Sequence, residues 1–114
     1  MKTYRSSEIK KFDKRPCLTG TFVHGEGVTL THWTFRKDAV LASHSHRHEQ
    51  ISYVVSGAVR FEAGDGEIKV VEAGDFAVFG PNETHGGVAL EDSVVLDAFS
   101  PAREDFKAEM GLKD

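Results

Sequence analysis

Four side chains of the types that bind transition metals fall into two short stretches of this sequence. His44, His46 and Gln50 lie within seven positions, and His85 comes much later, beside an expected turn. In an extended segment residues two apart point to the same face, so His44 and His46 would converge on one side. Three imidazoles and one amide oxygen would suit a divalent cation and leave room for water or substrate. The spacing therefore indicates a metal site, the alternative being histidines that decorate a polar loop.

The elements that must position these side chains are expected to be short strands separated by turns. Gln50 opens an apolar run that ends at Val55, and a turn such as residues 64–66 separates one run from the next. Strands of this length and spacing predict an all-β sandwich or barrel. After Pro101, the run from Ala102 to Leu112 predicts one short terminal helix. The expected strands lie near residues 19–24, 27–36, 50–56, 58–63, 67–72, 76–79, 84–90 and 92–99.

Length and charge narrow the class of protein. The chain has 114 residues, which suits one domain, and we expect a polar arm over residues 1–18 and one barrel domain over 19–114. The net charge is −4 with both signs interspersed, which does not favour nucleic acid as a partner. No apolar run has the length of a membrane span or a signal peptide, so we expect a cytoplasmic protein. The single cysteine, Cys17, excludes an internal disulfide.

Two motifs in this frame resemble those of the cupin family. The segment from His44 to Gln50, followed by Gly57, resembles the first cupin motif, and the segment from Gly74 to His85 resembles the second. The resemblance implies a double-stranded β-helix (jelly-roll) barrel that is usually dimeric. It also implies one divalent transition metal ion per chain in the mouth of the barrel. The ligands would be His44, His46, Gln50 and His85, and Ni, Zn, Mn, Fe and Co are not distinguished.

The chain departs from the usual cupin pattern at several positions. Gln50 stands where a Glu ligand is usual, and a neutral amide would hold a hard, highly charged metal less tightly. Asp38 and Asn82 replace common glycines, although Asn tolerates a left-handed backbone better than most residues. His48 shares the strand parity of His44 and His46 but is not a ligand in the cupin pattern. We therefore expect His48 to pack near the site or to support it.

The last expected strand carries a second set of candidate residues. Asp97 interrupts the apolar run from Val94 to Phe99, and a buried carboxylate is costly unless it is paired or hydrogen-bonded. An exposed strand face or a structural hydrogen bond would explain it. If the face shared by Asp97 and Phe99 instead lines the barrel, it offers an acid–base group and an apolar wall. Arg103 could hold an anion through two hydrogen bonds, or it could be a solvated helix charge.

A narrower resemblance covers residues 48–57, 88–92 and 96–106, which are similar to KdgF-type pectin-degradation cupins. That family also has Gln among its ligands. It acts on 4,5-unsaturated monouronates released by pectate and alginate lyases and converts them to linear keto-uronates. The resemblance places its functional Asp, Phe and Arg on Asp97, Phe99 and Arg103.

Two classes of function remain open at this point. The first is an enzyme for ring opening and ketonisation of an unsaturated sugar acid, with Asp97 moving the proton and Arg103 binding the uronate carboxylate. A cupin dioxygenase is the alternative enzyme, and a redox-active native metal would favour it. The second class is a non-catalytic module that binds a metal or a small metabolite. In each case we expect a homodimer that uses a strand from residues 19–36, because outward-facing Phe and Val need cover.

Overall fold

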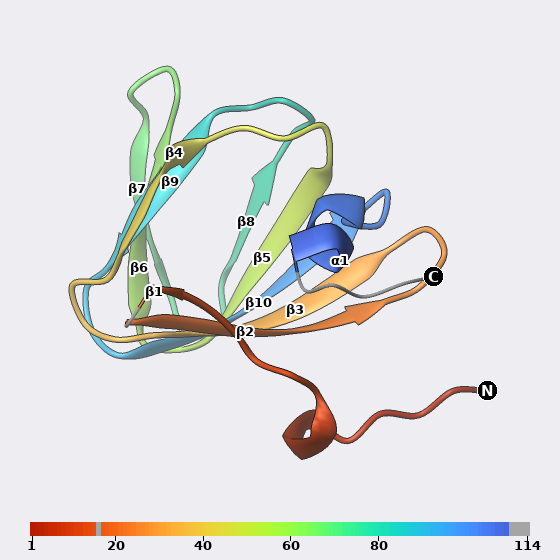
Figure 1. The fold of residues 1–114 in the computed structure, drawn as a ribbon. Coiled ribbons are helices and arrows are strands. Elements are labelled where there is room, and N and C mark those ends of the chain that lie inside the picture. Colours follow the sequence, from red (N-terminus) through yellow and green to blue (C-terminus); the bar gives the residue numbers. More distant parts are fainter. Residues whose placement is uncertain (16, 110–114) are drawn as a thin grey trace.

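Two antiparallel sheets face each other and form a barrel with one short helix (Figure 1). The structure is a computed structural model that describes residues 1–15 and 17–109. The strands are β1 Phe12–Arg15, β2 Leu18–His24, β3 Thr29–Phe35, β4 Val40–His44, β5 Glu49–Ser56, β6 Ala58–Ala63, β7 Ile68–Glu72, β8 Phe76–Phe79, β9 His85–Ala89 and β10 Ser93–Ser100; the helices are the 3-10 turn η1 Ser6–Glu8 and α1 Glu104–Glu109. The strand orders are β1-β2-β3-β10-β5-β8 and β4-β9-β6-β7. The expected all-β jelly-roll barrel is confirmed.

The strands of the larger sheet bury one face because their side chains alternate with period two. Along β3 the alternation is strict, with Thr29 buried, Leu30 exposed and the pattern continuing to Phe35. β10 has the same period, and Asp97 lies on its buried face. This alternation is typical of an antiparallel sheet with one packed face. The buried side chains that form the core are Leu18, Phe22, Trp33, Phe35, Ala39, Val54, Val59, Phe61, Val71, Phe79, Ala89, Val95, Phe99 and Phe106.

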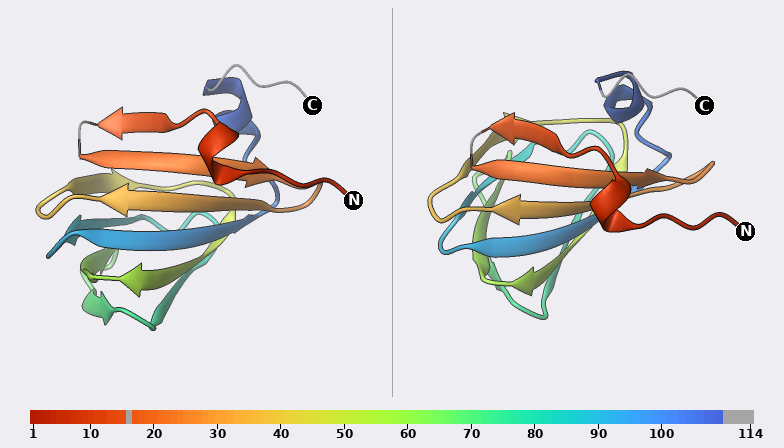
Figure 2. Two further views of the ribbon diagram at one scale, coloured as in Figure 1. Left: turned by 90° about the horizontal axis from the view of Figure 1, so that it is seen from below. Right: turned by 60° about the horizontal axis from the view of Figure 1, so that its bottom comes forward.

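Strand order in the larger sheet joins segments that are far apart in the sequence. β10 lies between β3 and β5, and Figure 2 shows these strands side by side. The register places Asp97 opposite Ser52 of β5, and Phe99 opposite Gln50 of the same strand. In the smaller sheet, His44 of β4 lies opposite His85 of β9. The pairing thus brings the candidate residues of both sequence stretches onto neighbouring strands.

Two strands lie where the sequence analysis expected none. β1 falls inside the expected arm of residues 1–18, and it pairs with β2 through a bulge between Asp13 and Arg15. β4 was not expected because its side chains do not alternate between buried and exposed, and its pairing with β9 shifts between Leu41 and His44. Both strands are short and irregular, so neither has a period-two signature. The expected helix over 102–112 is observed as α1, and residues 110–112 lie outside the described residues.

Two tight turns contain non-glycine residues in the left-handed backbone region. Asp38 has φ 71° and Asn82 has φ 63°, and these are the positions where the cupin pattern commonly has glycine. Asp and Asn are among the residues that adopt this conformation with least cost. The Asn82 N–H also donates to the His46 carbonyl at 2.7 Å, which ties this turn to the loop that carries His46. The substitutions therefore preserve the turns beside the candidate ligands.

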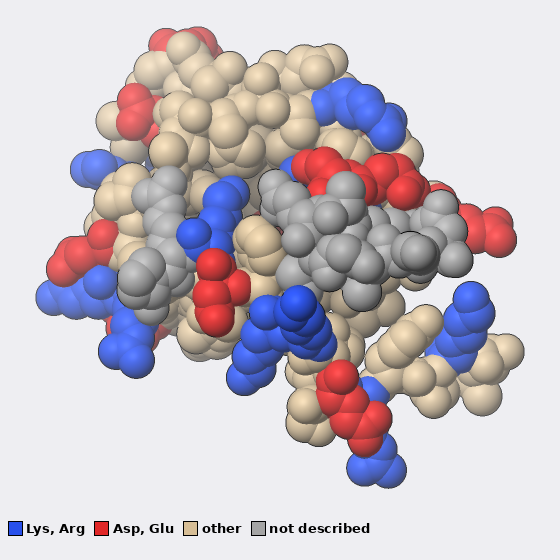
Figure 3. All heavy atoms as spheres, viewed as in Figure 1, with Lys and Arg blue, Asp and Glu red and all other residues tan. Residues whose placement is uncertain are grey.

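The outside of the barrel carries mixed charge. On the face that Figure 3 shows, Lys and Arg side chains are interspersed with Asp and Glu. The first ten residues extend away from the sheets, and the 3-10 turn η1 lies within this segment (Figures 1 and 2). Among the described residues, no helix has the length and hydropathy needed to cross a bilayer. The cytoplasmic location expected from the sequence stays a prediction.

We predict that Gly57→Ala lowers the free energy of unfolding by more than ~2 kcal/mol. Gly57 has φ +84°, which alone costs an L residue about 1–2 kcal/mol. The added Cβ would also meet Ser93 Oγ and the Asp92 carbonyl oxygen. Urea unfolding measures the change. Gly66→Ala is the matched control, because Gly66 has φ +88° but nothing within 4 Å of an added Cβ. Equal losses in the two variants would argue against the Ser93 contact.

Candidate metal centre

Three histidine side chains converge inside the barrel. His44 ends β4, His46 follows it in the loop before β5, and His85 opens β9. Their ligand atoms all lie within 4.8 Å of one another, and the ring centres of His44 and His85 are 4.5 Å apart. The structure therefore brings together three of the four expected ligands, which we call the histidine triad. This convergence suggests a metal site.

Each histidine of the triad uses its Nδ1 atom to donate to a backbone carbonyl two residues away. His44 donates to Ala42 at 2.9 Å, His46 to His48 at 3.1 Å, and His85 to Glu83 at 2.8 Å. This common pattern assigns the proton of each neutral ring to Nδ1 and leaves the Nε2 lone pair for a metal. The Nε2 atom of His85 is buried without a hydrogen-bond partner. This is expected of an atom whose partner would be a metal ion.

The fourth expected ligand, Gln50, lies beside the triad on the buried face of β5. Its Oε1 atom is 3.1 Å from His46 Nε2, while its Nε2 donates to Ser52 Oγ at 2.9 Å. With the His46 proton on Nδ1, both atoms of the 3.1 Å contact are acceptors, so they repel each other unless a cation lies between them. Two ligands about 2.1 Å from one ion lie about 3 Å apart when they subtend a right angle. The residues present therefore fit a transition metal ion.

Burial keeps the triad in the neutral form that binds metal. Loss of hydration lowers the pKa of His44 and His85 below the ordinary value of a histidine. It lowers the pKa of His46 to about 4, and the nearby positive charge of Arg103 acts in the same direction. An imidazole with a lowered pKa is unprotonated at neutral pH, so its lone pair is available without competition from a proton.

Asp97 lies inside the barrel and not on the exposed strand face. Its side chain is 7% exposed. The Ser52 hydroxyl donates to Asp97 Oδ1 at 2.6 Å, and Trp33 also hydrogen-bonds to the carboxylate. Burial raises the pKa of Asp97 to about 6, against the opposing effect of these hydrogen bonds. The carboxyl group can therefore change protonation state near neutral pH, as an acid–base group must.

Arg103 is a buried cation held by an acid that the sequence analysis did not single out. Its side chain is 7% exposed, and Nε and Nη2 donate to the two carboxylate oxygens of Asp105 at 2.9 and 2.6 Å. The guanidinium lies 3.7 Å from the ring centre of Phe106 and 4.6 Å from that of Phe99. Hydrogen bonds from Arg103 lower the pKa of Asp105 to about 2, so this pair stays ionised. Arg103 is thus not a solvated helix charge.

A small cavity connects these groups. Its volume is about 40 Å³, room for a few water molecules. Sequence reasoning missed several of its walls: Lys14 comes from the unexpected strand β1, and Phe106 comes from α1. The period-two pattern of residues 27–36 could have found Trp33 and Phe35 as partners on one face. The residues that line the cavity are Lys14, Leu18, Trp33, Phe35, Leu41, His44, Gln50, Asp97, Phe99, Arg103 and Phe106.

Of the remaining histidines, His48 lies beside the triad, with its ring centre 5.4 Å from that of His46. The side chain of His48 is buried, and burial lowers its pKa. The positive charge of Arg103 lowers this pKa further, and the negative charge of Asp105 raises it. Its backbone carbonyl is the acceptor for His46 Nδ1, so His48 supports the triad through its main chain. The His24 ring lies 2.8 Å from Thr29 Oγ1, and His32 is exposed on β3.

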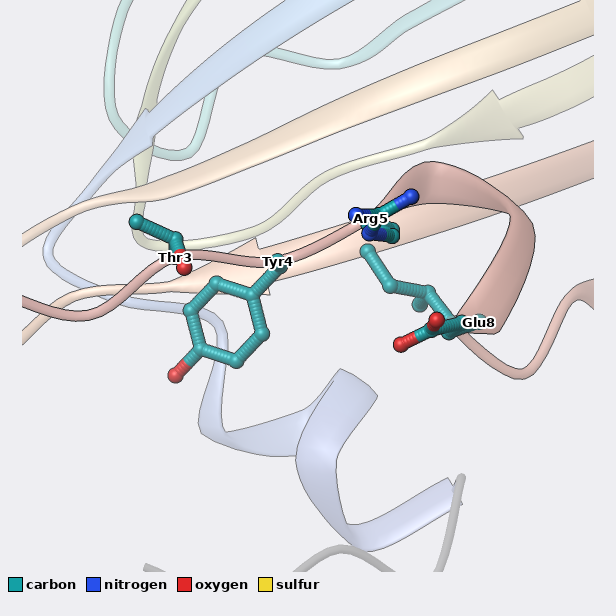
Figure 4. A pocket seen from close by; sticks show the side chains of 5 residues that line it. Thr3, Tyr4, Arg5 and Glu8 are labelled. Carbon is teal, nitrogen blue, oxygen red and sulfur yellow. The ribbon is translucent and has the colours of Figure 1, made fainter.

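A second hollow lies along the N-terminal segment, outside the barrel (Figure 4). It is lined by Thr3, Tyr4, Arg5, Glu8 and Ile9. None of these residues is a candidate ligand or acid–base group near the triad, so the cavity inside the barrel is the candidate site.

Comparison with known proteins agrees with this geometry. The model of the Cupin domain family matches residues 31–99, a range that includes the triad, Gln50 and Asp97 but not Arg103. The pectin degradation protein KdgF of Dickeya dadantii (strain 3937) is 42% identical over 74 residues, or 63% of this chain. The chain spans 66% of the length of that relative.

Two solved structures resemble the whole barrel. KdgF from Halomonas sp. superposes with a TM-score of 0.84 at 35% identity, over 92% of this chain and 99% of that one. An RmlC-like cupin from Shewanella frigidimarina NCIMB 400 superposes with a TM-score of 0.83 at 35% identity, over 90% of this chain and 93% of that one. The likeness therefore extends beyond the two motifs to the complete fold.

We predict that the purified protein carries about one divalent transition metal ion per chain. His44→Ala or His85→Ala should each lower the metal content and the affinity strongly, because each removes an Nε2 ligand. His48→Ala is the matched control and should retain the ion, since the backbone carbonyl that orients His46 is unchanged. Elemental analysis and calorimetric titration of chelator-treated protein measure both quantities. A loss in His48→Ala as large as in His44→Ala would show that the ligand set is different.

Proposed function

We propose that this chain, which belongs to the cupin family and is a small cupin of the KdgF type, is a metal-dependent enzyme of uronate metabolism. Its substrates would be 4,5-unsaturated monouronates from pectin or alginate breakdown, which it would convert by ring opening and ketonisation. The observation that carries the proposal is the buried carboxyl of Asp97 in the same cavity as the candidate ligand Gln50. A module that only binds metal has no need of such a group.

The proposed ligands of the single ion are His44, His46, Gln50 and His85. A bound divalent ion would supply a Lewis acid that stabilises the oxygen of an enol or enolate. All four ligands are neutral, so the ion would keep its double positive charge, and Asp97 would add one negative charge beside it. The resulting positive potential favours an anionic substrate such as a uronate.

Asp97 is the proposed acid–base group. Proton transfer is most efficient when the pKa of the transferring group lies near the working pH, and burial raises the pKa of Asp97 to about 6. Hydrogen bonds from Ser52 and Trp33 fix the position of the carboxylate on β10. In the proposed reaction Asp97 takes the proton from the anomeric hydroxyl while the bond between the anomeric carbon and the ring oxygen breaks, which leaves an aldehyde and an enolate. Asp97 then returns the proton to the enolate carbon, which completes the ketonisation.

Arg103 and Phe99 are the proposed substrate-binding residues. The planar guanidinium of Arg103 already binds one carboxylate through two hydrogen bonds, that of Asp105. A uronate carboxylate has the same shape and charge, so it can replace Asp105 as the partner of Arg103. A monouronate is larger than a 40 Å³ cavity, and we propose that its entry moves the segment of Arg103 and Phe106 outward. The ring of Phe99 would then form an apolar wall beside His46.

We predict that Asp97→Asn lowers kcat on lyase-made 4,5-unsaturated monouronates by about 10²–10⁴-fold. The change keeps the side-chain volume and removes the base. Arg103→Ala should instead act mainly by raising KM, because it removes the partner of the substrate carboxylate. Loss of ultraviolet absorbance reports consumption of the conjugated double bond, measured at saturating metal with spontaneous opening subtracted.

Asp75→Asn, which alters an exposed turn residue, is the control for the charge change and should turn over like the parent protein. Undiminished turnover in Asp97→Asn would refute the acid–base role. A parent protein without turnover on any of the candidate metals would favour the non-catalytic module. Oxygen consumption coupled to substrate loss would favour the dioxygenase.

A homodimer is the proposed assembly, formed through the outer face of the larger sheet. The register aligns five uncharged side chains in one row across five strands: Val78, Ile51, Ala98, Leu30 and Val23. Four of these are apolar residues at 38–62% exposure, which is unusual for the solvent face of an antiparallel sheet. The row has one residue on each of five neighbouring strands. In a dimer with a twofold axis the same row of a second copy can pack against it. The row includes two residues of the strands expected to form the dimer.

We predict a single species of twice the chain mass of 12.6 kDa by light scattering at micromolar concentration. Leu30→Lys together with Ile51→Lys should shift it toward monomer, because charge would be buried in the interface. Val70→Lys is the matched control, since Val70 is also exposed but lies on β7 of the smaller sheet. A monomeric parent protein would rule out the homodimer, and a monomeric Val70→Lys variant would place the interface elsewhere.

A further inference from the structure

Ser52 lies between a candidate metal ligand and the proposed acid–base group. Its side chain is fully buried on β5, opposite Asp97 of β10. The Ser52 hydroxyl accepts a hydrogen bond from Gln50 Nε2 at 2.9 Å and donates to Asp97 Oδ1 at 2.6 Å. A hydroxyl has one proton, and here Asp97 receives it. Toward Gln50, Ser52 Oγ therefore presents only lone pairs and can only accept a hydrogen bond.

The direction of these hydrogen bonds decides which end of the Gln50 amide faces the triad. A primary amide has two hydrogens on nitrogen and an acceptor oxygen, and only the oxygen can bind a cation. In the observed orientation Oε1 lies 3.1 Å from His46 Nε2. Rotating the amide by half a turn would point its N–H groups at the metal position. It would also set Oε1 against the lone pairs of Ser52, so two acceptors would face each other.

We propose that Ser52 is a positioning residue that holds the Gln50 amide with its oxygen toward the metal. This inference rests on the metal site of the proposed function but not on the uronate reaction. Gln50 also interacts with the Asp97 carboxylate, which favours the same orientation. Removal of the Ser52 hydroxyl should therefore weaken the preference without abolishing it.

A carboxylate ligand at position 50 would not depend on Ser52 in this way. Its two oxygens are equivalent, so either one can face the metal after a half turn, whereas an amide has one correct orientation. The contribution of Ser52 to metal affinity should therefore be specific to an amide at position 50. A residue that merely packs the interior would contribute equally with either side chain.

The test is a double-mutant cycle on metal affinity with the full chain. Parent protein, Ser52→Ala, Gln50→Glu and the double variant are freed of metal with a chelator and titrated with Co²⁺, followed by calorimetry and by visible absorbance. Ser52→Ala should lower the Co²⁺ affinity about tenfold when Gln50 is present. In the Gln50→Glu background the same change should alter affinity by about twofold or less. Ser56→Ala, exposed on the same strand, is the control and should bind like the parent.

Equal losses in the two backgrounds would reduce Ser52 to a structural role, and no loss with Gln50 present would overturn the inference. A parent protein that does not bind Co²⁺ would overturn it as well. If Ser52→Ala does not fold, as judged by circular dichroism, Ser52→Cys keeps the volume and replaces the acceptor with a weak one, and it should show the same loss. Uronate turnover is not measured in this cycle, so failure of the proposed reaction would leave the outcome unchanged.

Discussion

Several hydrogen-bond acceptor atoms face one another inside this barrel, and no hydrogen-bond donor of the described residues lies between them. Each histidine of the triad gives its Nδ1 proton to a backbone carbonyl, and Ser52 holds the Gln50 amide by its nitrogen. What faces the centre is therefore a set of acceptors, with His46 Nε2 and Gln50 Oε1 3.1 Å apart. Such a set is electrostatically complete only around a cation, and the surrounding barrel holds the acceptors together against their mutual repulsion.

The arrangement of the two sheets brings these side chains together. His44 and His85 lie opposite each other in the smaller sheet, and Gln50 lies on β5 of the larger one. The register of β4 with β9 shifts between Leu41 and His44, the first proposed ligand, and such irregularities are common beside functional sites. Three of the four proposed ligands therefore lie on paired strands from both walls of the barrel, and His46 lies in the loop between β4 and β5.

In the described part of the chain, few charged groups lie around the neutral histidine triad and Gln50. Burial raises the pKa of Asp97 to about 6 and lowers the pKa of His46 to about 4, so both groups tend toward neutrality where water is excluded. Asp105 accepts hydrogen bonds from Nε and Nη2 on one edge of the Arg103 guanidinium, and the rings of Phe99 and Phe106 lie against it. In the proposed function a substrate carboxylate would take the place of Asp105 as the partner of this positive charge.

The sequence by itself determined the features that depend on local spacing. Short apolar runs separated by turns predicted most of the strands, and period-two spacing predicted that His44 shares a face with His46 and Asp97 with Phe99. Asn82 occupies a left-handed turn because its side chain tolerates that conformation. The tertiary structure decided what depends on partners from distant strands. Ser52 and Asp97 are 45 residues apart in the chain yet share a 2.6 Å hydrogen bond, and β1 and β4 pair without any alternation of their own. Strand pairing sets such contacts, and neither composition nor spacing within one segment carries information about which strand will lie opposite.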